Sequence, residues 1–178
     1  MKLPEKTQAI ALLRKTGCPQ NVIEHCLSVA ALAVEIAETC AKQGVAVNLH
    51  LVETGALLHD IGRAKTHDVR HGVIGSGMVA ELGLPDAVAL IVERHVGAGI
   101  TQEEAVKLGL PPRDYVPQTL EEKIVCYADK LISCNKKVSI EETLRQFTSD
   151  LGEGHPAIER LKALHEEIVK LARQDFNH

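Results

Sequence analysis

The chain contains no tryptophan, and its 178 residues include only two tyrosines and two phenylalanines. The core must therefore be aliphatic, and aromatic platforms that stack on single-stranded bases are not expected. None of the five cysteines follows a CxxC spacing, and most lie beside Ala, Leu or Val, as small hydrophobes do in a reducing compartment. The cysteine pattern favours core residues over a disulfide framework.

Long apolar runs are also absent. No window approaches 18 uncharged apolar residues, and the polar segment 1–8 lacks the apolar core of a signal peptide. We therefore expect a cytoplasmic protein that does not enter a membrane. The formal net charge of −4 and the lack of a long basic run argue against an extended nucleic-acid surface. Neither observation argues against binding of a small phosphorylated ligand.

Helix-forming segments rich in Ala, Leu, Glu and Lys alternate with Gly, Pro and Asn, and no period-2 strand of useful length occurs. The sequence predicts one all-α domain over residues 1–178, with a motif-bearing core at about 20–135 and C-terminal helices at about 136–178. Asn21 with Glu24 resembles a capping box, and Asp68 suits the N-cap of the fourth helix. The expected helices cover residues 6–15, 21–44, 48–60, 68–82, 86–96, 101–108, 119–134, 139–149 and 156–174.

Histidine and aspartate recur on helical segments whose neighbouring positions are apolar. At helical spacing, several of them look onto Val, Leu, Ile, Ala or Gly, which indicates buried faces. A buried carboxylate needs a cation, and a divalent metal binds imidazole and carboxylate directly. A shared metal centre is therefore the interpretation favoured for the set His25, His59, Asp60, His71, His95 and Asp129.

Each of these residues also has a simpler explanation. A single histidine on an apolar face is more often a hydrogen-bonded core residue than a ligand. Asp129 could pair with Lys130 or Lys123. A second His-Asp pair, His67-Asp68, shows that the dipeptide alone is a weak signal, and His67 could itself lie near the site. The simultaneous occurrence of several such residues is what favours a metal.

The ordered set His25, His59-Asp60 and Asp129 resembles the HD-domain superfamily of metal-dependent phosphohydrolases, whose signature is H…HD…D on an all-α bundle. The likeness covers about residues 20–135. It implies a helical bundle of the HD type, and it implies that these four residues coordinate one metal ion.

The chain also resembles the subset of that superfamily with two metals, in which two further histidines lie between the HD pair and the last Asp. His71 and His95 occupy those places, and Asp60 would then bridge both ions. Ala128-Asp129-Lys130 is similar to the A-D-K sequence of the HD-type hydrolases that cut diadenosine tetraphosphate symmetrically. The GYP signature of the cyclic-di-GMP phosphodiesterases is absent.

The resemblance implies a phosphohydrolase that acts on a nucleotide or another small phosphorylated metabolite. Two metals about 3.5–4 Å apart convert a bridging water into hydroxide and clamp the phosphoryl oxygens. Four His with two carboxylates suit Fe, Mn, Co, Ni or Zn better than Mg or Ca. The side chains expected to neutralise phosphate are Arg63 and Lys130, then Arg94 and Arg113.

Two other functions fit the same residues: a one-metal nucleoside monophosphate phosphatase, and a catalytically silent module that binds metal or nucleotide. The Gly- and Pro-containing loop 97–117 is expected to border the substrate pocket. His155 and His165 are expected to be solvated. The apolar stripe of the last helix, which includes Leu161 and Ile168, could cap the bundle or form a homodimer.

Overall fold

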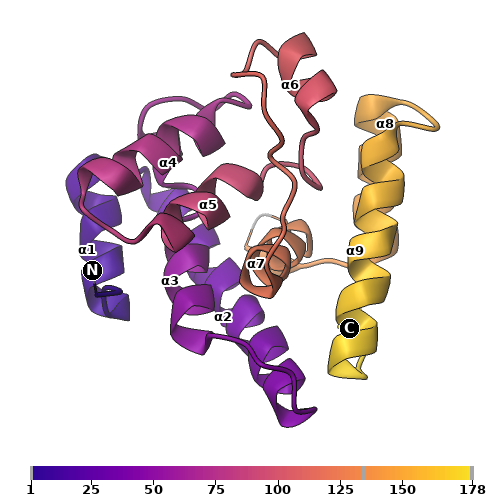
Figure 1. The fold of residues 1–178 in the computed structure, drawn as a ribbon, viewed down its shortest axis with the longest axis horizontal. Coiled ribbons are helices and arrows are strands. Elements are labelled where there is room, and N and C mark those ends of the chain that lie inside the picture. The colour runs from indigo at the N-terminus through magenta and orange to yellow at the C-terminus, as the bar shows by residue number, and fades with distance from the viewer. Residues whose placement is uncertain (1, 134, 177–178) are drawn as a thin grey trace.

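A computed structural model describes residues 2–133 and 135–176 of the chain. Within these residues the fold is a helical bundle with one small hairpin (Figure 1). The prediction of an all-α bundle is confirmed. The elements are α1 (Lys6–Thr16), α2 (Gln20–Lys42), α3 (Leu49–Leu58), the 3₁₀ helix η1 (Ile61–Ala64), α4 (His71–Glu81), α5 (Asp86–Arg94), α6 (Gln102–Lys107), α7 (Leu120–Lys130), β1 (Ile132–Ser133), β2 (Lys136–Lys137), α8 (Ile140–Leu151) and α9 (Pro156–Ala172).

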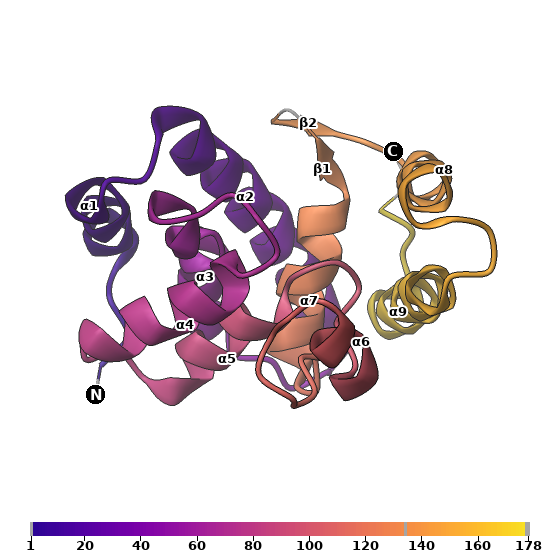
Figure 2. The same ribbon diagram turned by 90° about the horizontal axis from the view of Figure 1, so that it is seen from above.

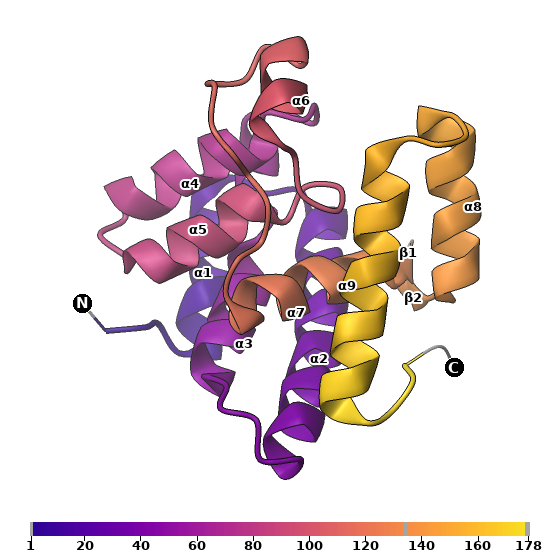
Figure 3. The same cartoon turned by 45° about the vertical axis from the view of Figure 1, so that its right-hand side comes forward.

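The long helix α2 packs against both α3 and α7. The pair α4 and α5 packs on the other side of α3, with α1 beside it. Seen from above, α8 and α9 form a pair on the far side of α7 from α3 and α4 (Figure 2). The same pair stands beside the bundle in Figure 3, where α9 lies alongside α2 and α7. Segments from most of the chain therefore meet around α2 and α7.

The apolar stripe on α9 faces this bundle. Leu161 and Ile168 are fully buried, and α9 contacts α2, α7 and α8. Of the two roles considered for this stripe, capping the bundle is the one that the structure shows. Aliphatic side chains make up most of the buried core, as the shortage of aromatic residues requires.

Two predicted helix caps are wrong, although both helices begin within three residues of the expected positions. Asn21 does not cap α2, because the helix begins at Gln20 with Pro19 in the N-cap position. Asp68 does not begin α4, because its carboxylate accepts the backbone N–H of Arg70 at 2.8 Å in a local turn. The helix then starts at His71. The side chain of Asp68 instead stabilises a local turn, and that of Asn21 lines a cavity.

The predicted helix at 119–134 also ends too late. Helix α7 stops at Lys130, and the chain turns into the antiparallel pair β1–β2, in which Ile132 faces Lys137. Asn135 has a φ of +62°, a conformation that asparagine tolerates better than most residues. Strands of two residues are too short to produce an alternating pattern, so the sequence could not reveal them.

The cysteines behave as the sequence predicts in the part of the chain that the structure describes. Cys18, Cys26, Cys40 and Cys126 are free thiols and buried, whereas Cys134 lies outside the described residues. Burial raises the pKa of the Cys126 thiol to about 11. A thiol held in its protonated form is a poor nucleophile, so this cysteine has a packing role. None of the described helices combines the length and apolar character needed to span a membrane.

Candidate metal centre

The six predicted ligands reach one place from five segments of the chain. His25 lies in the second turn of α2, and His59 and Asp60 directly follow α3. His71 is the first residue of α4, His95 directly follows α5, and Asp129 lies in the last turn of α7. The ends of α3, α5 and α7 and the start of α4 therefore converge beside α2.

One half of the cluster is built around Asp129. Its Oδ1 lies 2.9 Å from His25 Nε2 and 3.5 Å from His59 Nε2. His59 Nε2 lies 3.7 Å from Asp60 Oδ2, so this carboxylate closes the group. His59 is fully buried, whereas His25 keeps 22% of its side chain exposed. These four residues form the set that the H…HD…D pattern predicts for one ion.

The other half is built around the second oxygen of the same aspartate. Asp60 Oδ1 lies 3.3 Å from His71 Nε2 and 3.4 Å from His95 Nε2. The two imidazole nitrogens lie 3.1 Å apart. Asp60 thus turns one oxygen towards His59 and the other towards His71 and His95.

Backbone carbonyls fix the orientation of three imidazole rings. The Nδ1 atoms of His59, His71 and His95 each lie 2.7 Å from the carbonyl oxygen of the residue three positions earlier. Since a carbonyl only accepts, each Nδ1 carries the proton and donates it. In the neutral rings the lone pairs of Nε2 are then directed into the cluster, as metal ligation requires.

Within the described residues, buried acceptors in the cluster have no hydrogen-bond partner. His59 Nε2 and Asp60 Oδ1 are both fully shielded and unpartnered. Although burial alone would raise it, the pKa of Asp60 is held well below its usual range by His59 and His95. Burial and the nearby His95 lower the pKa of His71 to about 4, which keeps this ring neutral. Clustered lone pairs beside an ionised carboxylate fit a divalent cation.

Two basic side chains contact the carboxylates of the cluster. Arg63 Nε donates to Asp60 Oδ2 at 2.7 Å. Lys130 forms an ion pair with Asp129. Burial alone would lower the pKa of the lysine and raise that of the aspartate, but the ion pair shifts the pKa of each group in the opposite direction. Lys123 instead pairs with Glu167. Lys130, and not Lys123, is therefore the lysine that pairs with Asp129.

A cavity of about 500 Å³ opens onto the cluster. It is lined by Asn21, Val22, His25, Asp60, Arg63, His67 and Asn135. Sequence reasoning missed Asn21 as a site residue, although its spacing of four from His25 places both on one helix face. Asn135 reaches the cavity from the hairpin turn, and its position depends on the short strands that the sequence does not reveal.

Arg94 and Arg113 do not line this cavity. Arg94 Nη1 donates to the buried carboxylate of Glu122 at 2.9 Å, and Arg113 forms an ion pair with Glu93. Loop 97–117 likewise contributes no lining residue to the cavity at the metal cluster; its residues 97–100 line a different cavity.

Replacing Arg94 with methionine is expected to lower the free energy of unfolding by about 3 kcal/mol, because the buried Glu122 carboxylate loses its cationic partner and keeps the N–H of Gln118. If Arg94 does not bind substrate, KM should stay unchanged. Urea unfolding and steady-state kinetics measure the two effects. The control Lys162→Met breaks only an exposed pair with Glu159 and should cost less than about 1 kcal/mol. A raised KM with unchanged stability would show that Arg94 contacts substrate.

Comparison with known proteins places the chain in a family. The family model of the HD domain matches residues 22–133. The uncharacterized protein MJ0778 of Methanocaldococcus jannaschii is 49% identical over 169 residues, covering 95% of this chain and 99% of its own. A tRNA (cytidine(56)-2'-O)-methyltransferase of Picrophilus torridus is 37% identical and covers 98% of this chain. The chain spans only 49% of the length of that methyltransferase.

More distant likenesses involve proteins with other names. Ribonuclease Y of Chloroflexus aurantiacus is 33% identical over 119 residues, which are 66% of this chain and 19% of the ribonuclease. Among solved structures, the HD domain of the Listeria monocytogenes phosphodiesterase PgpH has a TM-score of 0.52 at 19% identity. The likeness covers 91% of this chain and 97% of that one. At this identity the likeness shows the fold alone.

Proposed function

Because the chain belongs to the HD domain family, we propose that it is a metal-dependent phosphohydrolase with a binuclear site. The observation that carries the proposal is the position of Asp60. Its Oδ2 faces His59, whereas its Oδ1 faces His71 and His95 and is buried without a hydrogen-bond partner. A single ion would not need a second group of imidazoles on the far oxygen.

The residues divide between two ions in this proposal. His25, His59, Asp60 and Asp129 would hold one ion, and Asp60, His71 and His95 would hold the other. Bound divalent metals supply Lewis-acid polarisation of phosphoryl oxygens and lower the pKa of water. The second group offers only three protein ligands, which leaves room for solvent and substrate. The mixed His and carboxylate set favours Fe, Mn, Co, Ni or Zn over Mg or Ca.

The chain's own residues then bind and orient the substrate. Arg63 lies at the cavity and is held in place by Asp60, so it can present its remaining N–H groups to a phosphate. Asn21, His67 and Asn135 offer hydrogen bonds around the same cavity. Lys130 is committed to Asp129 and would act through that aspartate by offsetting its charge.

The substrate we propose is a nucleotide or another small phosphorylated metabolite. A cavity of about 500 Å³ lies within the usual range for small-molecule sites. A net charge of −4 does not favour an extended nucleic-acid surface. The HD domain of PgpH has been solved in complex with cyclic-di-AMP, and its likeness to this chain has a TM-score of 0.51. A dinucleotide is therefore a suitable member of the test panel.

A second candidate is hydrolysis of a phosphodiester in RNA. The relatives named tRNA methyltransferase and ribonuclease Y favour it, because the names of both concern RNA. Only a short piece of RNA, such as a chain end, would reach the cavity in this case. The acidic charge of the chain makes this the weaker candidate.

Element-resolved metal analysis of protein purified without chelator tests the proposed site. We expect about two ions per chain in the parent and about one in His71→Ala and in His95→Ala. His50→Ala is the matched control, since its ring contacts the carbonyl of Pro4 outside the cluster. One ion or fewer in the parent, unchanged by either substitution, would leave a one-metal phosphatase or a silent binding module.

A substrate panel then separates the chemical classes. The metal-loaded protein is assayed for phosphate release or product formation with nucleoside monophosphates, diadenosine tetraphosphate, cyclic-di-AMP and a short RNA. Chelator-sensitive turnover of a small nucleotide supports the main candidate, and cleavage of the RNA alone supports the second. Two bound ions without turnover of any panel member would favour the silent module.

A further inference from the structure

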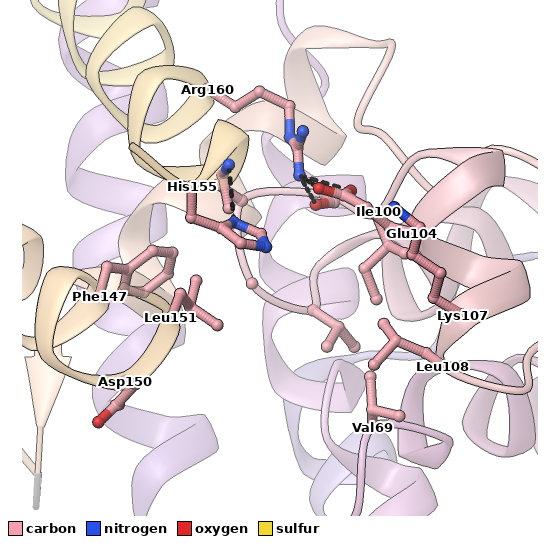
Figure 4. A pocket seen from close by; sticks show the side chains of 15 residues that line it. Val69, Ile100, Glu104, Lys107, Leu108, Phe147, Asp150, Leu151, His155 and Arg160 are labelled. Atoms are coloured by element: carbon pink, nitrogen blue, oxygen red, sulfur yellow. Dashed lines mark hydrogen bonds and ion pairs between the residues drawn. The ribbon is translucent and has the colours of Figure 1, made fainter. Parts of the chain in front are cut away.

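A second cavity of about 370 Å³ lies between α6 and the α8–α9 pair (Figure 4). It shares no lining residue with the cavity at the metal cluster. Its size lies within the range of small-molecule sites, and apolar side chains form most of its wall. The larger apolar residues that line it are Val69, Val96, Ile100, Leu108, Phe147 and Leu151.

A histidine presents a hydrogen-bond donor inside this apolar wall. The Nδ1 atom of His155 accepts the backbone N–H of Ala157 at 3.2 Å and thereby caps α9. Since Nδ1 accepts, the neutral ring carries its proton on Nε2. Figure 4 shows the ring between Leu151 and Ile100, directed into the cavity. Within the described part of the chain, Nε2 of His155 has no hydrogen-bond partner. The ring is partly buried.

The charges around the cavity cancel. Arg160 Nη2 donates to Glu104 Oε2 at 2.7 Å and to the carbonyl of Gly99 at 3.0 Å, so its charge is already balanced. Lys107 and Asp150 carry opposite charges at the exposed edge. An anion such as a nucleotide phosphate gains no net attraction here. The cavity therefore suits an uncharged ligand with an apolar body.

We propose that this cavity binds an uncharged planar heteroaromatic group, of which a nucleoside is the model compound. The apolar walls would take the faces of the ring, and an acceptor atom at the ring edge would take the N–H of His155. This cavity is distinct from the cavity at the metal cluster, where hydrolysis is proposed. It nevertheless adjoins the metal cluster, because Val96 directly follows His95 and a Cβ added at Gly72, next to His71, would meet Val96 Cγ2 at 2.8 Å.

Titration of Zn²⁺-loaded protein with adenosine tests the proposal by two-dimensional amide NMR. Adenosine has no phosphate, so it is not a substrate for phosphoryl hydrolysis and its binding is independent of the proposed activity. We expect saturable shifts in residues 97–100 and 147–160, and none around Asp60. A lack of saturable shifts, or shifts gathered around Asp60 and Arg63, would overturn the proposal.

Three variants locate the ligand. Leu151→Gln removes an apolar wall that is already 45% exposed, and it should raise the Kd of adenosine about fivefold. His155→Asn keeps a capping oxygen but removes the Nε2 donor, so the Kd should rise about threefold. Leu49→Gln alters a leucine that is 39% exposed and lies away from the cavity, and it should leave the Kd unchanged. Parental affinity in both cavity variants would contradict the proposed site.

Discussion

Turnover should fall by about 10³-fold or more when Asp60 is replaced by asparagine. Changes in groups that only support metal ligands typically cost 10–100-fold, and Asp60 faces both histidine groups directly. The amide keeps the shape of the side chain but removes the negative charge that would offset the two proposed divalent cations. Steady-state kinetics on the best panel substrate and metal analysis of the same preparation measure the effect. We expect both ions to be lost or strongly weakened.

The second His-Asp pair provides a matched control for this substitution. Asp68 is exposed, pairs with Arg70 and does not line the cavity at the metal cluster. Asp68→Asn should therefore leave turnover and metal content at the parental values. Wild-type turnover in Asp60→Asn, or an equal loss in both variants, would refute the assigned role of Asp60. Circular dichroism of each variant separates loss of metal from loss of fold.

The clustering of these residues was predictable because polar and charged side chains occupy positions whose helical neighbours are apolar. His59 and Asp129 stand on apolar helical faces, and burying them needs a chemical reason that a sequence can signal. The order of these residues along the chain then favours a metal as that reason. What the sequence does not contain is the geometry: that Asp60 turns one oxygen to each histidine group follows only from how the end of α3 meets α4 and α5.

The surroundings of the cluster were less predictable. Arg94 directly precedes the predicted ligand His95, yet it pairs with the carboxylate of Glu122. Arg113 likewise pairs with Glu93. An arginine beside a ligand and an arginine in a structural pair look alike in a sequence, since both need only a negative partner. Asn135 enters the cavity from a hairpin of two-residue strands, which has no periodic signal.

Replacing Gly62 with alanine should destabilise the protein by more than about 4 kcal/mol, an exceptional value for a single substitution. A Cβ at this position would lie 2.0 Å from the carbonyl oxygen of His71 and 2.8 Å from the backbone nitrogen of Gly75. Both contacts are with backbone in the first turns of α4, which cannot move aside as a side chain could. The 3₁₀ helix η1 and α4 would have to separate.

A matched control lies further along the same helix. Gly77 is exposed in α4, and a Cβ added there meets nothing within 4 Å. Alanine loses less backbone entropy than glycine in a helix, so Gly77→Ala should stabilise the protein by about 0.5–1 kcal/mol. In a chain of this size the melting temperature should rise by about 2 °C in this variant and fall by more than about 8 °C in Gly62→Ala. Thermal unfolding measures both.

The effect of Gly62→Ala should also reach the metal cluster. Gly62 lies two residues after Asp60, and the atom that its Cβ would strike belongs to His71. Moving η1 away from α4 would therefore lengthen the 3.3 Å distance between Asp60 Oδ1 and His71 Nε2. Folded Gly62→Ala should bind fewer than two ions, whereas Gly77→Ala should bind as many as the parent. Parental stability and metal content in Gly62→Ala would show that the contact between η1 and α4 is looser than the structure has it.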